Sequence, residues 1–314
     1  EKYLRHGDVI IEKSGGSDKQ PVGRVIFFEG EENKYLFNNF TGLLRVQNPE
    51  EWLPKYVFYA LYAYYRNGGT RAFENRTTGL HNLQVDNYVK SVDIPKLSYR
   101  KQQHICETLD HVRDAVAYRE RQLTKLDELI KARFVEMFGD PYTNSKDYPL
   151  KKGESFFKLS NGKAVPESKR LNGGIPAYGG NGISWYTDES LFDADTIVVG
   201  RVGFQSGNVH LVKGPLWVTD NAMYMSSCDF SQYNLTFLIE LMAHVDFTKF
   251  QDAGDLKKIT QRPFMQFEYL CPPLSLQNQF ADFVAEVDKS KVEVQKALDQ
   301  TQLLFDSLMQ QYFG

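Results

Sequence analysis

Two stretches decide how this chain is built: IPKLSYRKQQ at residues 94–103 and CPPLSLQNQF at residues 271–280. Each places proline and Leu-Ser before a long segment that has glutamine near its start and neither glycine nor proline inside. Each long segment closes on an aromatic-glycine pair, in MFG at 137–139 and in YFG at 312–314. Glycine and proline are the strongest local signals for the end of a helix. The two stretches therefore predict the beginnings of two uninterrupted helices.

The two long segments have the apolar spacing of a coiled coil. Apolar residues recur at alternating intervals of four and three over 100–138 and over 276–313, where the stripe is wider. At about 1.5 Å per residue, each helix would be on the order of 55 Å long, too long for a core helix of an ordinary domain. We predict an antiparallel coiled coil, with Arg119 and Arg133 interrupting its seam; independent tails that bind a partner remain the alternative. The predicted pairing residues are Leu109, Val116, Leu123, Ile130, Val287, Val294, Leu304 and Leu308.

The segments before the long helices also repeat. Aligning Asp8 with Asp195 matches GDVIIEKSGG with ADTIVVGRVG, two β-rich runs that end in glycine-punctuated loops carrying a cation. A helical stretch and a second polar loop follow in the same order in both halves. The sequence thus predicts an α+β fold with two similar β-rich heads separated by two long helices. The predicted bounds are a first head at 1–99, a central helix and linker at 100–144, a second head at 145–272 and a C-terminal helix at 273–314.

The two heads differ in length at their beginnings. Residues 145–194 precede Asp195 in the second head, whereas only residues 1–7 precede Asp8, and the first residue is Glu1 rather than methionine. We therefore expect the sequence to begin inside the first head, which would be incomplete at its N-terminus.

Composition limits the classes of protein to consider. A chain of 314 residues with 42% hydrophobic and 14% aromatic residues can bury the cores of two domains. Its formal net charge is −3, so a DNA-binding role requires cations sorted onto one face or supplied by a partner. No apolar run reaches the roughly 18 residues of a membrane helix, which predicts a cytoplasmic protein without membrane contact. The three cysteines are far apart and predict neither disulfides nor a zinc site.

Two glycine-rich loops of the second head, YGGNGI and GRVGFQSG, lack the spacing of phosphate-binding loops. Arginine pairs well with guanine edges and glutamine with adenine edges, so the second loop is suited to DNA bases. Cations and amides also follow Gly254, with similar residues at the matching place in the first head. Surface turns and a solvated charged face remain the simpler alternatives. The predicted DNA-binding residues are Asn181, Arg201, Gln205, Ser206, Lys257, Lys258, Gln261 and Arg262 in the second head, and Lys13, Arg76, Asn82 and Gln84 in the first.

The sequence predicts no catalytic residues and no metal site. The Glu-x-Lys runs at 32–34 and 167–169 have no persuasive acidic partner upstream, and no Asn-Pro-Pro-aromatic motif of adenine methylation is present. No set of nucleophile and base repeats between the heads.

The order and duplication of these segments resemble the specificity subunit of type I restriction-modification systems. The likeness rests on the proline and Leu-Ser joints, on MFGD at 137–140, on DTIVVGRVG at 195–203 and on WVTDNA at 217–222. The first-head loop, with Glu-Lys-Ser, departs from this pattern.

The resemblance implies a non-catalytic protein whose two target-recognition domains each recognise one half of a split double-stranded DNA sequence. The helices would set the gap between the halves and dock methyltransferase subunits. Those subunits would use S-adenosylmethionine to methylate adenine, and restriction subunits would join for cleavage; no cofactor is expected on this chain. Two alternatives remain open, a coiled-coil scaffold of the same origin that no longer recognises DNA and a detached specificity half of a fused nuclease-methylase.

Overall fold

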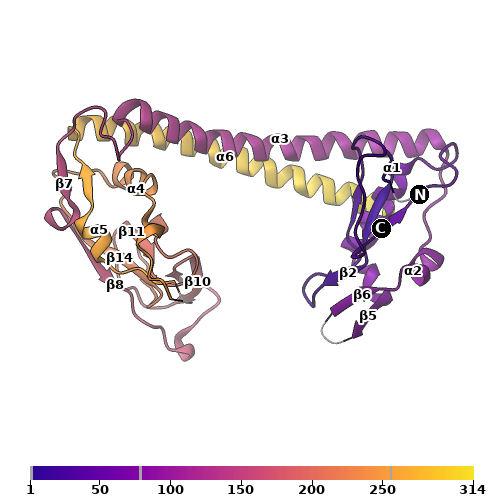
Figure 1. The fold of residues 1–314 in the computed structure, drawn as a ribbon, viewed down its shortest axis with the longest axis horizontal. Coiled ribbons are helices and arrows are strands. Elements are labelled where there is room, and N and C mark those ends of the chain that lie inside the picture. Colours follow the sequence, from indigo (N-terminus) through magenta and orange to yellow (C-terminus); the bar gives the residue numbers. More distant parts are fainter. Residues whose placement is uncertain (1–2, 78–79, 255–256) are drawn as a thin grey trace. The chain divides into compact units, whose positions relative to one another are not determined.

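The computed structural model describes residues 3–77, 80–254 and 257–314, with the side chains of residues 76 and 77 left out. The uninterrupted helices predicted from the joints are confirmed. They are α3 (Tyr99–Phe138) and α6 (Leu274–Phe313), each 40 residues long (Figure 1).

The chain divides into two compact units, each described here by itself. Unit 1 comprises Glu1–Gln122 and Glu293–Gly314, and unit 2 comprises Leu123–Val292. Each unit therefore holds one head together with one part of α3 and one part of α6. The domain bounds predicted from the sequence stay predictions.

The head of unit 1 is a small α+β structure. A three-stranded antiparallel sheet in the order β3-β1-β4 packs against α1, and β2, β6 and β5 form a second small sheet. Buried residues alternate along β1, as expected of a strand with one face on the core. The elements are β1 (Val9–Glu12), β2 (Ser14–Gly16), β3 (Val25–Phe27), β4 (Thr41–Leu44), α1 (Pro54–Arg66), β5 (Glu74–Thr77), β6 (Leu80–Leu83) and α2 (Val85–Ser91).

The head of unit 2 also contains an antiparallel sheet next to a helix, together with two further small sheets. Its sheets have the orders β12-β11-β14-β8, β10-β9-β13 and β15-β7. All five residues of β11 are buried, because one face lies on the main core and the other on a second apolar cluster. The elements are β7 (Leu150–Lys152), β8 (Phe157–Asn161), β9 (Ile175–Gly179), β10 (Gly182–Thr187), β11 (Thr196–Gly200), β12 (Val209–Val212), β13 (Trp217–Val218), β14 (Ala222–Cys228), α4 (Leu235–Ala243), α5 (Arg262–Gln266) and β15 (Glu268–Leu270).

Backbone hydrogen bonds confirm that the heads repeat one structure. The amide of Leu83 donates to the carbonyl of Lys13 at 2.8 Å, and the amide of Ile259 donates to the carbonyl of Arg201 at 3.0 Å. In both heads the cation therefore directly follows the middle strand of three, β1 in unit 1 and β11 in unit 2. Its carbonyl is bound by the second polar segment, which contains Leu83 in unit 1 and Ile259 in unit 2. The predicted correspondence of these two loops is thus confirmed.

The same hydrogen bonds correct the alignment of the heads by one residue. Lys13 is equivalent to Arg201, whereas the alignment of Asp8 with Asp195 would pair Lys13 with Gly200. A shift of one residue moves a strand's side chains to the opposite face, so packing decides the register. The inward residues of the two strands are Val9 and Ile11 in β1, and Ile197 and Val199 in β11.

One edge strand distinguishes the heads. Strand β4 of unit 1 is the equivalent of β14 in unit 2. The outer edge of β14 pairs with β8, whereas no described strand pairs with the outer edge of β4. A hollow of about 500 Å³ lined by Leu43, Leu44 and Tyr88, among others, lies beside β4. In unit 2, Phe157 and Leu159 of β8 are buried in the core.

A buried glutamine explains why the joints repeat. In unit 1 the side chain of Gln102 is fully buried at the start of α3. Its Nε2 donates to the carbonyls of Glu51 (2.9 Å) and Leu97 (3.0 Å), and its Oε1 accepts from the amide of Leu53 (2.8 Å), which caps α1. One side chain therefore joins the start of the long helix to the start of the head's helix.

Gln277 makes the same three hydrogen bonds in unit 2. Its Nε2 donates to the carbonyls of Gln232 (2.9 Å) and Pro272 (2.8 Å), and its Oε1 accepts from the amide of Asn234 (2.8 Å), the cap of α4. Each glutamine lies five residues after the nearer carbonyl. The buried glutamines are therefore the equivalent residues of the two joints. The Leu-Ser pairs are not equivalent, because one precedes α3 and the other forms the first turn of α6.

The two long helices pack together in both units. In unit 1 the core contains Leu109 of α3 with Phe305 and Met309 of α6, and in unit 2 it contains Ile130 with Val287. The beginning of one helix meets the end of the other, so the predicted antiparallel pairing is confirmed. The predicted pairing residues that are half-buried are Val116, Leu123, Val294 and Leu308.

The prediction that Leu304 lies in the helix seam is wrong, because its side chain is 50% exposed. The neighbouring row of the wide apolar stripe faces inward instead. Phe305 is buried and its ring lies 6.5 Å from that of Tyr62 in α1, so packing on the head selects this row.

Arg133, which interrupts the predicted seam, lies over an aromatic ring of the facing helix. Its guanidinium lies 5.7 Å from the ring centroid of Phe283 in α6, and its Nη1 donates to Glu136 at 2.8 Å. A flat cation over an aromatic face keeps its charge while covering apolar surface.

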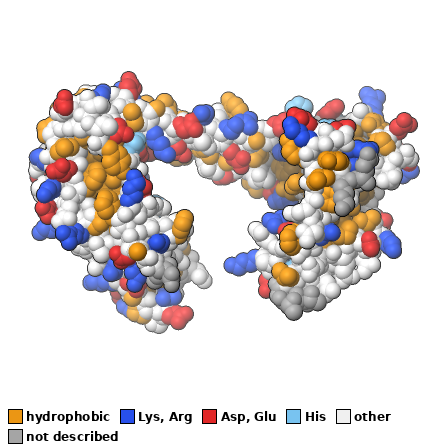
Figure 2. All heavy atoms as spheres, viewed as in Figure 1, with side chains coloured by type: hydrophobic (Ala, Val, Ile, Leu, Met, Phe, Trp, Pro, Cys, Tyr) orange, Lys and Arg blue, Asp and Glu red, His pale blue; other side chains and the backbone are white. Residues whose placement is uncertain are grey.

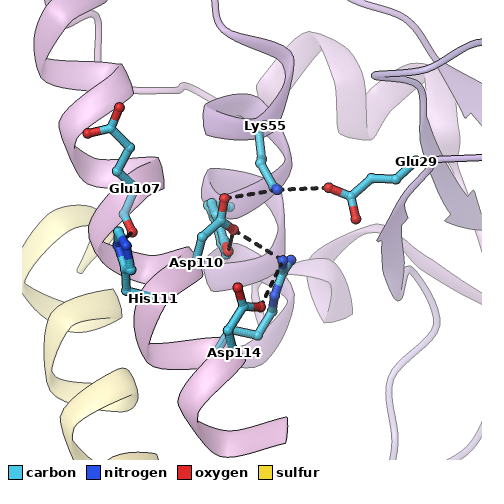
Figure 3. A network of polar contacts seen from close by, with 8 residues as sticks. Glu29, Lys55, Glu107, Asp110, His111 and Asp114 are labelled. Carbon is cyan, nitrogen blue, oxygen red and sulfur yellow. Dashed lines mark hydrogen bonds and ion pairs between the residues drawn. The ribbon is translucent and has the colours of Figure 1, made fainter. Parts of the chain in front are cut away.

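A polar network fixes α1 to α3 in unit 1 (Figure 3). Asp110 of α3 accepts hydrogen bonds from the Tyr59 hydroxyl at 2.5 Å and from Lys55 at 2.9 Å, and Arg113 lies 3.3 Å away. Lys55 also binds Glu29 at 2.8 Å. Burial alone would lower the pKa of Lys55, but its bonds to Glu29 and Asp110 outweigh burial and raise it. The head is thus attached to α3 by charge as well as by apolar packing.

Candidate nucleic-acid interface

The loop at 201–207, which joins β11 to β12 in unit 2, has a fixed backbone. The amide of Gly203 donates to the carbonyl of Lys257 at 2.8 Å, and the amide of Gly207 donates to the carbonyl of Gly200 at 2.8 Å. Gly203 and Gly207 have φ values of +95° and +101°, which other residues rarely adopt. The glycines therefore allow a tight loop whose position is set by the second polar loop.

The prediction that Ser206 contacts DNA is wrong, because its side chain is fully buried. The turn directs Ser206 into the protein, where its carbonyl accepts a hydrogen bond of 2.6 Å from Nε2 of Gln251. Its neighbour Gln205 is exposed and keeps the predicted access to a ligand.

The turn between β9 and β10 packs directly on this loop. A Cβ added to Gly180 would lie 3.3 Å from Cα of Gly200, and one added to Gly200 would lie 2.8 Å from the carbonyl oxygen of Gly180. The contact of 2.8 Å is too close for a side chain and the contact of 3.3 Å is tight, so these glycines allow the turn to pack against the end of β11. Asn181, exposed on the same turn, consequently lies on a neighbouring loop as predicted.

Three of the predicted residues line one hollow. Arg201, Gln261 and Arg262 surround a volume of about 630 Å³, together with Glu154 and Asn161. Gln261 donates from Nε2 to Oδ1 of Asn161 at 3.2 Å, which orients its amide. Sequence reasoning missed Asn161, because it lies on β8, a hundred residues before Gln261.

The remaining predicted cations of the second head lie beside the loop. Lys258 is exposed and its backbone bridges to Val202, while Lys257 is half-buried. Among the described residues, no acidic side chain forms an ion pair with Arg201, Lys257 or Lys258. These positive charges remain available to an anionic ligand.

The first head brings its predicted residues together less completely. Lys13 precedes β2, and Ser14 of β2 pairs with Asn82 of β6. Gln84 is exposed and accepts a hydrogen bond from Asn87 at 2.7 Å. The backbone of Arg76 lies in β5, and its side chain falls outside the described residues.

Charge is mixed over each unit. Figure 2 shows Lys and Arg side chains next to Asp and Glu side chains on this face of both units, without one continuous basic surface. The local group around Arg201 is therefore a better candidate for DNA contact than this face as a whole.

No described helix is both long and apolar enough to cross a membrane. Within the described ranges, no three His, Cys, Asp or Glu side chains lie together in a way that could hold a metal ion.

The second head, with the loops around Arg201, is the part of the chain that a family comparison matches. Residues 146–301 match the family model of the type I restriction modification DNA specificity domain. This match spans the second head and much of α6, and this part of the chain is a type I restriction-modification DNA specificity domain.

Among solved structures, the chain is similar to the S subunit of the type I restriction-modification system from M. genitalium. The TM-score is 0.65 at 15% identity, over 100% of this chain and 84% of that one. A structure from work on complex assembly and conformational transition of the type I R-M system gives a TM-score of 0.58 at 14% identity, over 99% and 82% of the two chains. These two likenesses support the fold.

A curated relative is the putative type I restriction enzyme specificity subunit S.HindORF215P of Haemophilus influenzae. It is 23% identical over 120 residues, which are 37% of this chain and 31% of that protein. The matched stretch thus spans less than a third of the relative's length.

Proposed function

We propose that this chain is the non-catalytic DNA-recognition subunit of a type I restriction-modification complex. The second head would recognise one part of a bipartite target through Arg201, Gln205, Lys258 and Gln261. The first head would serve the other part, because its Lys13 loop is built on the same backbone frame. Two recognition domains with the same topology suit a DNA target that consists of two parts.

The observation that carries this proposal is the group of cations and amides around Arg201. These side chains come from segments far apart in the sequence, yet backbone hydrogen bonds hold the segment of Arg201 beside that of Lys257. Cations that form no ion pair with a described residue, next to exposed amides, suit phosphates and base edges at once. A surface turn without a ligand would not require such an arrangement.

The partners and the cofactor are part of the proposal. Methyltransferase subunits would dock on the exposed apolar residues of α3 and α6, among them Leu303 and Leu304. They would carry S-adenosylmethionine and methylate adenine in the double-stranded target, and restriction subunits would add cleavage. Balanced charge supports this arrangement, because the partners could supply further cations to the DNA backbone.

The test replaces Arg201 with alanine in the complex assembled with its methyltransferase subunits. If Arg201 binds a base edge, specific binding should fall by roughly 5- to 150-fold, the equivalent of about 1–3 kcal/mol, while nonspecific binding changes little. The specific target would first be found by profiling methylated adenines, and binding would then be measured on duplexes with and without it.

Lys158→Ala is the matched control, since this exposed lysine lies on β8 beside Ser227, at the end of β14 far from Gly200. If the Arg201→Ala variant lost the same affinity for every DNA sequence, Arg201 would contact only phosphates. A wild-type complex without any sequence preference would contradict the proposed function and favour the scaffold that no longer recognises DNA.

A further inference from the structure

Phe204 is the most exposed large apolar side chain among the described residues. Its side chain is 92% exposed, whereas the other exposed large apolar residues range from 36% to 69% and so rest partly on the protein. Scattered apolar residues on a surface need no special explanation. A ring that touches almost none of its own protein makes no contribution to the fold.

Phe204 is nevertheless held in place. It lies between Gly203 and Gly207, whose amides bind the carbonyls of Lys257 and Gly200. The Phe204 carbonyl also accepts a hydrogen bond of 3.4 Å from Nε2 of Gln251. The backbone would tolerate a polar residue here equally well, so the loop does not require a phenylalanine.

The surroundings of the ring indicate the chemistry of its partner. The loop carries Arg201 and Gln205, and its backbone is joined to Lys257 and Lys258. A partner that accepts an aromatic ring among cations must present an anionic exterior and flat apolar faces inside. Duplex DNA has both, with phosphates outside and stacked bases within.

We propose that Phe204 enters a groove of the bound DNA and stacks against the bases at the part of the target recognised by the second head. The inference rests on the proposed function, because it requires that this head binds DNA. Apolar side chains can wedge between base steps and kink a duplex, and an aromatic ring can stack on any base. Phe204 would thereby add sequence-dependent DNA deformation to the contacts of Arg201.

The first head offers an internal comparison. Its equivalent loop extends from Lys13 to Gly23, where Gly23 has the same positive φ as Gly207. The tip of that loop is Ser-Asp-Lys-Gln at residues 17–20, without an aromatic residue. An aromatic side chain that could enter the DNA is therefore present only in the loop of the second head. Only the part of a bipartite target bound by that head should be distorted.

The test uses the complex of the full chain with its methyltransferase subunits and target duplexes carrying 2-aminopurine, a base whose fluorescence rises when it is unstacked. Phe204→Ala should weaken specific binding by about 5- to 150-fold and abolish a fluorescence rise in the part of the target bound by the second head. Phe204→Trp should retain binding, and its indole fluorescence should be quenched by DNA. Phe230→Ala is the matched control, because Phe230 is also exposed but follows the opposite end of β14.

The outcomes separate the two proposals. If the wild-type complex binds no specific duplex, the proposed function and this inference both fail. If it binds, and Phe204→Ala changes neither affinity nor 2-aminopurine fluorescence, only the inference is overturned. Loss of methyltransferase from the purified complex, with unchanged DNA affinity of the chain, would assign Phe204 to a protein partner and would also overturn it.

Discussion

At the scale of single residues, two buried glutamines carry the connection between head and helix. Gln102 and Gln277 each satisfy one donor and two acceptors of the backbone where a head meets its long helix. A buried backbone group without a partner costs more free energy than a typical hydrogen bond contributes. No apolar residue could replace the glutamine without leaving these groups unpaired.

Gln277→Leu should therefore lower the free energy of unfolding of unit 2 by roughly 2–4 kcal/mol, since three backbone groups lose their partner in the interior. The loss would be measured by thermal unfolding and by hydrogen exchange of the Asn234 amide, which should become faster. Gln279→Leu, at an exposed position of the same helix, is the control. Similar behaviour of both variants would show that the hydrogen bonds contribute little to the joint.

At the scale of elements, α3 belongs to the core of each head as much as to the coiled coil. In unit 2, Phe134 of α3 is fully buried among three aromatic rings. These are Phe138 of the same helix, Phe237 of α4 and Phe280 of α6. The helix seam and the head's core are thus one continuous cluster. A substitution in the helix seam should therefore also lower the stability of the head.

Phe134→Ala should destabilise unit 2 by about 3–5 kcal/mol, because it removes a large ring from a closely packed cluster and leaves a cavity. Urea unfolding would measure the change, with Val135→Ala as the control on the exposed face of the same helix. If the two variants unfolded alike, the head would not depend on the helix for its core.

At the scale of the whole molecule, the charge balance determines how DNA binding should respond to salt. The chain has a formal net charge of −3, and on the face shown in Figure 2 its cations are interspersed with acidic side chains. Each phosphate neutralised by a cation releases counterions and makes binding more sensitive to salt. We therefore expect the chain alone to engage few phosphates.

The assembled complex should therefore show a steeper fall of affinity with salt than the chain alone, by about 0.9 in the logarithmic slope for each phosphate contact that the partners add. Binding to the specific duplex would be measured over a salt series for both. Equal slopes would mean that the partners add no phosphate contacts.

The sequence by itself determined the two long helices, their antiparallel pairing, the repetition of the heads and the place of the cations. These follow from local signals, namely apolar periodicity, the absence of glycine and proline, and matched order along the chain. Such signals are short in range, so they survive without knowledge of the packing.

Only the tertiary structure decided which of several locally equivalent side chains turn inward. Periodicity could not distinguish the row of Leu304 from that of Phe305, because the head's α1 makes that choice. Sequence could not place Ser206 inside and Phe204 outside either, since hydrogen bonds from Gln251, 45 residues or more away in the chain, set the turn between them. Loop orientation depends on such distant contacts, and the candidate DNA interface depends on loop orientation.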